Sequence, residues 1–151
     1  MRDKNSPSQK IQTSERMHGF TLVELMVVIL IVGVLAAVAI PLLQGRIDEA
    51  RWSEACATAG TIRVAVRAYA AESSITTAQG LVGKNLGDAS TRAILGFDSQ
   101  DCEGTYFASS DYTITAISAN GFGVITVTGG SKANSPTGAH VLQANGDWIR
   151  Q

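Results

Sequence analysis

A long uncharged stretch near the beginning of the chain constrains the fold more than any other feature. From Leu25 to Leu43 the sequence runs for 19 residues without a charged or strongly polar side chain. A helix of that length measures about 28 Å, close to the roughly 30 Å hydrocarbon core of a bilayer. Lipid offers no hydrogen-bond partners to the backbone, so a lone spanning segment must be helical. The stretch therefore predicts a transmembrane helix.

The residues before this stretch have a different composition. Residues 1–19 carry four basic and two acidic side chains and almost no core-forming ones. Such a segment is typical of an address or processing signal that the mature fold does not contain. Basic residues that precede a spanning helix favour a cytoplasmic N-terminus, so we expect the rest of the chain to cross the membrane.

The helical pattern continues beyond the apolar stretch. Apolar side chains recur at spacings of three and four from Ala55 to Tyr69, while charged residues fall on the other faces. We therefore expect one helix from about Phe20 to about Glu72, roughly 80 Å long. Pro41 should kink or locally loosen it, because proline removes one backbone hydrogen bond and its ring clashes with the preceding turn.

The remainder of the chain predicts a small sheet. Residues 73–104 have no clear period, and five β-prone runs follow them. Four of these runs flank the two hairpin signals, Asn120-Gly121 and Asn145-Gly146. The expected strands are Tyr106–Ala108, Tyr112–Ile117, Phe122–Thr128, His140–Gln143 and Asp147–Arg150.

These features divide the chain into a leader (1–19), a transmembrane or filament-core half of the helix (20–43) and an extracytoplasmic head (44–151). Within the head we expect helix over 44–72, loop over 73–104 and antiparallel sheet over 105–151. The predicted fold class is α+β, with a long kinked N-terminal helix that packs one stripe on one face of the sheet.

A single acid, Glu24, lies just before the apolar stretch. A carboxylate at membrane depth costs about 2.5–3.5 kcal/mol on insertion scales, so such a residue usually has a specific partner. The next base along the helix is Arg46, which is too far away to reach it. Cleavage between Gly19 and Phe20 would create a new α-amine near this carboxylate.

The segment from His18 to Glu24, followed by a long apolar helix with Pro41, resembles the N-terminal signal of type IV pilins and type II secretion pseudopilins. The resemblance implies that Gly19 is the last leader residue, recognised by an inner-membrane prepilin peptidase of the aspartic type. Phe20 would be the first mature residue, N-methylated by the same enzyme. Glu24 would pair with the Phe20 amine of a neighbouring subunit during assembly, and Pro41 would match the proline that kinks the family helix.

The same resemblance implies a pilin-like fold and a structural role rather than an enzymatic one. The expected protein is a single-pass inner-membrane subunit with an extracytoplasmic head, which then enters a periplasmic or cell-surface filament. Its partners would be other copies, related minor subunits, the prepilin peptidase and an inner-membrane assembly platform. A type IV pilin and a secretion pseudopilin both fit these features.

Other interpretations remain open at this stage. Ala37-Val38-Ala39 satisfies the small-residue rule for a conventional signal peptide, so the chain could be a secreted binding protein or enzyme. A plain membrane-anchored globular protein is a further alternative, although it leaves Glu24 without a role. A formal net charge of −1 gives no strong field for nucleic acid. We find no catalytic constellation and expect no cofactor.

Two smaller features concern the head. Cys56 and Cys102 are expected to form a disulfide after translocation, because the compartment is oxidising. Asp98, Asp101 and Glu103 could gather oxygens around a calcium ion, but their spacing is not that of an EF-hand and a solvated acidic turn is the favoured interpretation.

Overall fold

The structure is a computed structural model that describes residues 19–151. The predicted leader therefore lies outside the described residues, except for Gly19. The chain divides into two compact units, one that ends at Pro41 and one that covers Leu42–Gln151.

One helix, α1 (Leu22–Glu72), contains 51 residues and confirms the predicted long helix. Its start has a local cause, because the Thr21 side-chain oxygen accepts a hydrogen bond from the backbone N–H of Glu24 at 3.2 Å. This contact satisfies one of the donors that the first turn of a helix leaves free. Pro41 lies inside the helix, and the helical assignment continues without interruption on both sides of it.

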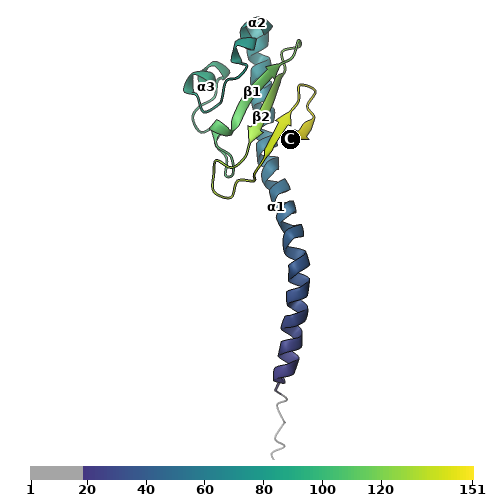
Figure 1. Ribbon diagram of the computed structural model, residues 1–151. Helices are drawn as coiled ribbons and strands as arrows, with labels where there is room; N and C mark the ends of the chain where they lie inside the picture. Colours follow the sequence, from purple (N-terminus) through teal and green to yellow (C-terminus); the bar gives the residue numbers. More distant parts are fainter. Residues whose placement is uncertain (1–18) are drawn as a thin grey trace, which may run out of the picture. The chain divides into compact units, whose positions relative to one another are not determined.

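The unit from Leu42 onward contains a four-stranded antiparallel sheet in the order β1-β2-β3-β4 (Figure 1). Successive strands pair as neighbours, which needs only short connections. The sheet confirms the predicted α+β class. Its strands are β1 (Tyr112–Ile117), β2 (Gly123–Thr128), β3 (Ala139–Leu142) and β4 (Trp148–Arg150).

The core lies between the second half of α1 and one face of this sheet. Ala55 and Ala59 are fully buried, and their small side chains let the strands come close to the helix. Alternate residues of β1 and β2 point into the same core, as the period of a strand requires. The other buried apolar members of this cluster on the helix and the strands are Trp52, Ile62, Val66, Tyr112, Ile114, Ile125, Val127 and Leu142.

Both predicted hairpin turns are present. Gly121 adopts a φ of 78°, a left-handed conformation that glycine adopts readily. The turn closes with a hydrogen bond from the Ser118 N–H to the Phe122 carbonyl at 2.9 Å, and the second closes with one from the Gln143 N–H to the Asp147 carbonyl at 2.8 Å. The Asn-Gly signals therefore fix the two hairpins of the sheet.

Two arginines of α1 bind these hairpins to the helix. The guanidinium groups of Arg63 and Arg67 lie 4.6 and 5.3 Å from the ring centroid of Phe122. Arg63 also donates a hydrogen bond to the carbonyl of Ala144 in the second turn. Both arginines therefore interact within the subunit. Their guanidinium groups contact an aromatic ring, and Arg63 also binds a backbone oxygen.

The stretch predicted as a loop, residues 73–104, is more ordered than its sequence suggested. It contains α2 (Ile75–Ala78), a 3₁₀ turn (Gln79–Leu81) and α3 (Ala89–Leu95). Asp88 caps the start of α3 by accepting the Ser90 N–H, and Gly96 ends it in a left-handed conformation. The residues between these helices pair with the free edge of β1, for example through Gly83 N–H to the Ile114 carbonyl at 2.7 Å.

The predicted strand at Tyr106–Ala108 is wrong. The backbone N–H groups of Tyr106 and Phe107 donate to Oε1 of Glu54 on α1, at 2.9 and 3.3 Å. The N–H of Ala108 donates to the Asp111 carboxylate at 2.9 Å. Side-chain carboxylates therefore take the donors that a strand would have used, and a 3₁₀ turn (Ser109–Asp111) follows.

The predicted disulfide is also wrong, since Cys56 and Cys102 are both free thiols. Cys102 is 1% exposed and belongs to the core. Cys56 lies one residue after Ala55 and four after Trp52, at the edge of the buried stripe, and is only half-buried. Burial, with a further contribution from Asp101, raises the pKa of the Cys102 thiol.

The two thiols should consequently react at different rates. With the full-length chain in detergent, a water-soluble thiol reagent should modify Cys56 rapidly and Cys102 only after unfolding, because burial both shields the Cys102 sulfur and disfavours its thiolate. Mass spectrometry before and after denaturation measures this directly. A Cys56→Ser variant that still reacts rapidly, or a native mass two hydrogens short of the reduced form, would contradict the assignment.

Candidate assembly interface

The unit that ends at Pro41 exposes its apolar side chains on all sides. From Phe20 to Ile40 the large apolar residues are between 48% and 78% exposed. This part of α1 is long and apolar enough to cross a membrane, and none of its most apolar window is buried within the chain. Exposure of this extent marks a surface that contacts lipid or protein.

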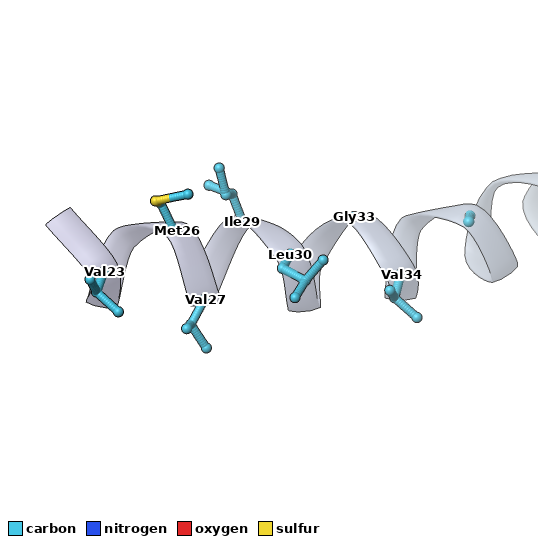
Figure 2. A pocket seen from close by; sticks show the side chains of 8 residues that line it. Val23, Met26, Val27, Ile29, Leu30, Gly33 and Val34 are labelled. Atoms are coloured by element: carbon cyan, nitrogen blue, oxygen red, sulfur yellow. The ribbon is translucent and has the colours of Figure 1, made fainter.

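The apolar side chains of this segment are arranged in a regular pattern along the helix (Figure 2). Figure 2 shows Val23, Val27, Leu30 and Val34 on one side of the helix, at the spacings of four and three that form a single stripe. A shallow hollow runs along these residues and their neighbours. A Cβ built on Gly33 meets no atom within 4 Å, so this position leaves room for a partner helix.

The structure leaves the Glu24 carboxylate without an ion-pair partner among residues 19–151. The ion pairs in that part of the chain are Arg46–Glu49, Arg51–Asp48 and Lys132–Glu103. Arg46 is 22 residues further along the helix, about 33 Å away. Within residues 19–151, no ion pair therefore offsets the charge of this acid.

Gly19 and Phe20 precede the first helical residue, and both are exposed. The peptide bond between them lies in non-helical backbone next to the start of α1. A peptidase requires an accessible bond outside regular secondary structure. The geometry is compatible with the predicted processing position.

The three acidic calcium candidates do not form one site. Asp101 accepts the backbone N–H of Asp98 at 2.7 Å, which closes a local turn. Glu103 instead binds Lys132 and the backbone N–H of Ser109, each at 2.8 Å. Within residues 19–151, no three metal-binding side chains lie close enough together to hold an ion.

The Glu103–Lys132 contact fastens the β2–β3 connection to the segment before β1. The Lys132 ammonium also donates to the carbonyl of Gly104 at 2.6 Å. Hydrogen bonds from Lys132 and from the Ser109 N–H lower the pKa of Glu103 to about 2. The carboxylate is therefore ionised throughout the physiological range.

A feature that the sequence did not reveal is a hollow in the head, which we call the aromatic hollow. Trp52 of α1, His140 of β3 and Trp148 of β4 form an aromatic cluster. His140 and Trp148 stack with ring centroids 5.4 Å apart, and Trp52 lies tilted against His140 with centroids 3.9 Å apart. The strand register explains the stack, because His140 pairs with Arg150 and Leu142 with Trp148, which places positions 140 and 148 on one face. The hollow has a volume of about 490 Å³ and is lined by Gly45, Asp48, Glu49, Trp52, Ser53, Cys56, Pro136, Thr137, His140, Trp148 and Arg150.

The pKa of Glu103 predicts an acid-sensitive contribution to stability. The folded pKa of about 2 lies below the ordinary 4.5, so this contribution is present above about pH 4.5 and is lost as the pH falls towards 2. Glu103→Gln should lower the free energy of unfolding by about 0.5–1 kcal/mol at pH 7, because the pair is partly screened by solvent. The difference between wild type and variant should shrink as the pH falls from 4.5 through 2, and it should vanish only below about pH 2. Chemical denaturation as a function of pH measures it, and a difference that is independent of pH would contradict the prediction.

Comparison with known proteins places these features in a family. The family model of the prokaryotic N-terminal methylation motif matches residues 16–40, which include Gly19, Phe20 and Glu24. The fimbrial protein EcpB of Eikenella corrodens is 40% identical over 62 residues, 41% of this chain and 39% of the relative. A probable minor fimbrial protein of Dichelobacter nodosus is 36% identical over 66 residues, 44% of this chain and 42% of the relative. The chain thus spans about two fifths of these two relatives.

A longer match extends through the head. The type IV major alpha-pilin of Moraxella bovis is 31% identical over 127 residues, which cover 82% of this chain and 76% of that pilin. No solved structure matches the chain. The methylation motif, the exposed apolar helix followed by a small antiparallel sheet, and a match over most of both sequences show that this chain belongs to the type IV pilin family.

Proposed function

We propose that the chain is a structural subunit of a type IV pilus filament. The observation that carries the proposal is the exposure of every large apolar side chain from Phe20 to Ile40. A water-soluble monomer cannot keep such a surface in water, but a bilayer or a bundle of identical helices can cover it. The proposed role is mechanical and involves no chemical reaction.

Maturation would precede assembly. A prepilin peptidase would cut between Gly19 and Phe20 and methylate the new amine, in keeping with the methylation motif over residues 16–40. The motif match and the family membership favour this position over a conventional cleavage after Ala39. The mature subunit would wait in the inner membrane as a single-pass protein, with the head (44–151) outside the cytoplasm.

Assembly would exchange lipid for protein around α1. Burial of a Val-, Leu- or Ile-sized side chain is worth about 1.5–3 kcal/mol relative to water, so many such residues together stabilise a bundle outside the bilayer. Gly33 would allow close approach of one helix to another, since it carries no side chain and no atom lies within 4 Å of a Cβ built there. An assembly platform in the inner membrane would move subunits from lipid into the bundle.

Glu24 would set the register of neighbouring subunits. Its carboxylate has no cation within residues 19–151, and the amine of a processed Phe20 supplies one. Each amine would pair with the carboxylate of an adjacent copy. Buried ion pairs contribute little net stability but are costly to break, so the pair would act on alignment more than on strength.

The relatives favour a pilus over a secretion pseudopilus. The proteins reported above are named fimbrial proteins or a pilin, and they include a major and a minor subunit. We therefore place this chain in a surface filament with other copies of itself and with related minor subunits.

The proposal is tested by replacement of Glu24. Glu24→Val should leave membrane insertion and cleavage intact, because it makes the helix more apolar. It should lower the yield of sheared filaments at least about tenfold, because the Phe20 amine of each neighbour loses its counter-charge. Filament yield by electron microscopy and immunoblotting measures the effect.

Glu49→Val is the matched control, since Glu49 is an exposed acid on the same helix with its own partner, Arg46. This variant should assemble nearly as wild type does. The mass of the mature N-terminus verifies that both variants are processed before Phe20. If correctly processed Glu24→Val subunits polymerised like the wild type, the proposed pairing would be refuted.

A further inference from the structure

We propose that the aromatic hollow of the head binds a neutral pyranose sugar. The hollow lies entirely within the unit Leu42–Gln151, and filament formation through α1 does not require it. Its volume of about 490 Å³ lies within the range of small-molecule sites, which is about 300–1,000 Å³. The inference therefore adds a ligand site to the proposed structural role.

The aromatic wall of the hollow supplies a flat apolar surface. His140 and Trp148 stack with an interplanar angle of 5°, and the Trp52 ring is tilted by 57° against His140, with its centroid 3.9 Å from that of His140 and 6.4 Å from that of Trp148. Trp52 and His140 are 7% and 8% exposed, while Trp148 is half-buried and forms the accessible end of the stack. A platform held by packing in this way loses little freedom when a ligand binds. The C–H face of a pyranose ring is an apolar surface of matching shape.

Hydrogen-bonding groups of both kinds surround this platform. Asp48 and Glu49 each use one carboxylate oxygen in a local ion pair, Oδ1 and Oε2 respectively, and their second oxygens can accept from sugar hydroxyls. Arg150 is exposed and offers donors, and Thr137 offers a hydroxyl that can do both. Sugar hydroxyls also donate and accept, so a ring with hydroxyls at its edge matches this set.

The charges around the hollow favour a neutral ligand over a cation or an anion. The two lining acids, Asp48 and Glu49, are paired with Arg51 and Arg46. Together with Arg150, the group holds three positive and two negative charges. This small positive excess disfavours a quaternary ammonium, the usual cation of aromatic sites. The carboxylates that line the hollow itself disfavour an anion.

His140 adds no charge to this balance. Burial, with a further contribution from Arg150, lowers the pKa of its imidazole. The ring is therefore neutral at pH 7 and acts as part of the apolar wall.

The composition of the chain provides a direct assay. Trp52 and Trp148 are its only two tryptophans, and both line the hollow. Intrinsic fluorescence of the full-length chain therefore reports on this site. The protein is kept in a polyoxyethylene detergent, whose headgroup contains no sugar ring, and is titrated with the methyl pyranosides of galactose, glucose and mannose.

At least one of these pyranosides should produce a saturable change in the millimolar range or below. Sorbitol, which has the hydroxyls but no ring face, and choline, which has the charge of a cage ligand, should produce none. Absence of saturation with all three pyranosides would overturn the proposal. An equal response to sorbitol, or a stronger one to choline, would also overturn it.

A second readout uses Cys56, which lines the same hollow. The bound sugar should slow modification of Cys56 by a thiol reagent, while buried Cys102 serves as the internal reference. Trp148→Ala should weaken this protection at least about tenfold in sugar concentration, because it removes the accessible ring. Ile149→Ala, the adjacent exposed residue on β4, is the matched control and should leave it unchanged.

Arg150→Ala provides an independent variant if removal of Trp148 disturbs the fold, since Arg150 lies at the surface. It should also weaken protection while the circular dichroism spectrum stays that of the wild type. Protection that survives in folded Trp148→Ala and in Arg150→Ala alike would show that the sugar binds elsewhere.

Discussion

An apolar helix surface that a single subunit cannot bury is the constraint on which the rest of this protein depends. The helix α1 pairs its backbone internally, apart from the one hydrogen bond that Pro41 cannot donate, but from Phe20 to Ile40 its large apolar side chains are exposed. A lipid bilayer and a bundle of identical helices are two environments that remove the free-energy cost of exposing these side chains to water. Because both are equally apolar, passage from one to the other is close to balanced, and a specific polar contact can decide the arrangement of the subunits.

In the head, by contrast, α1 buries part of its apolar surface within the subunit. There α1 exposes polar residues on one side and buries a narrow stripe, in which Ala55 and Ala59 let the sheet approach. Several charged side chains bind other groups of the same subunit. Glu54 holds two backbone donors, Arg63 and Arg67 stack on Phe122, and Glu103 binds Lys132. These contacts hold the irregular segments of the head in place around the four-stranded sheet.

The features that follow a strong local pattern could be predicted from the sequence, and those that rest on distant contacts could not. The long helix and both Asn-Gly hairpins have periodicity or turn chemistry of their own. The strand expected at Tyr106–Ala108 failed because Glu54, more than fifty residues away, captures its donors. The short helix α3 had a signal in the capping Asp88 and in Gly96, but no apolar period. The aromatic hollow joins α1 to a strand pair and has no linear motif, and nothing in the spacing of Cys56 and Cys102 indicated that they face different surroundings.

The burial of the α1 stripe in the assembled filament is the central claim, and thiol accessibility at one position tests it most directly. Val27→Cys in a Cys56→Ser background places a reporter within the stripe, and Asn145→Cys in the same background places one on an exposed turn of the head. In sheared filaments, a water-soluble maleimide should label position 145 rapidly and should label position 27 only after the filaments are dissociated. Rapid labelling of position 27 in intact filaments would contradict the claim that helix packing covers this surface.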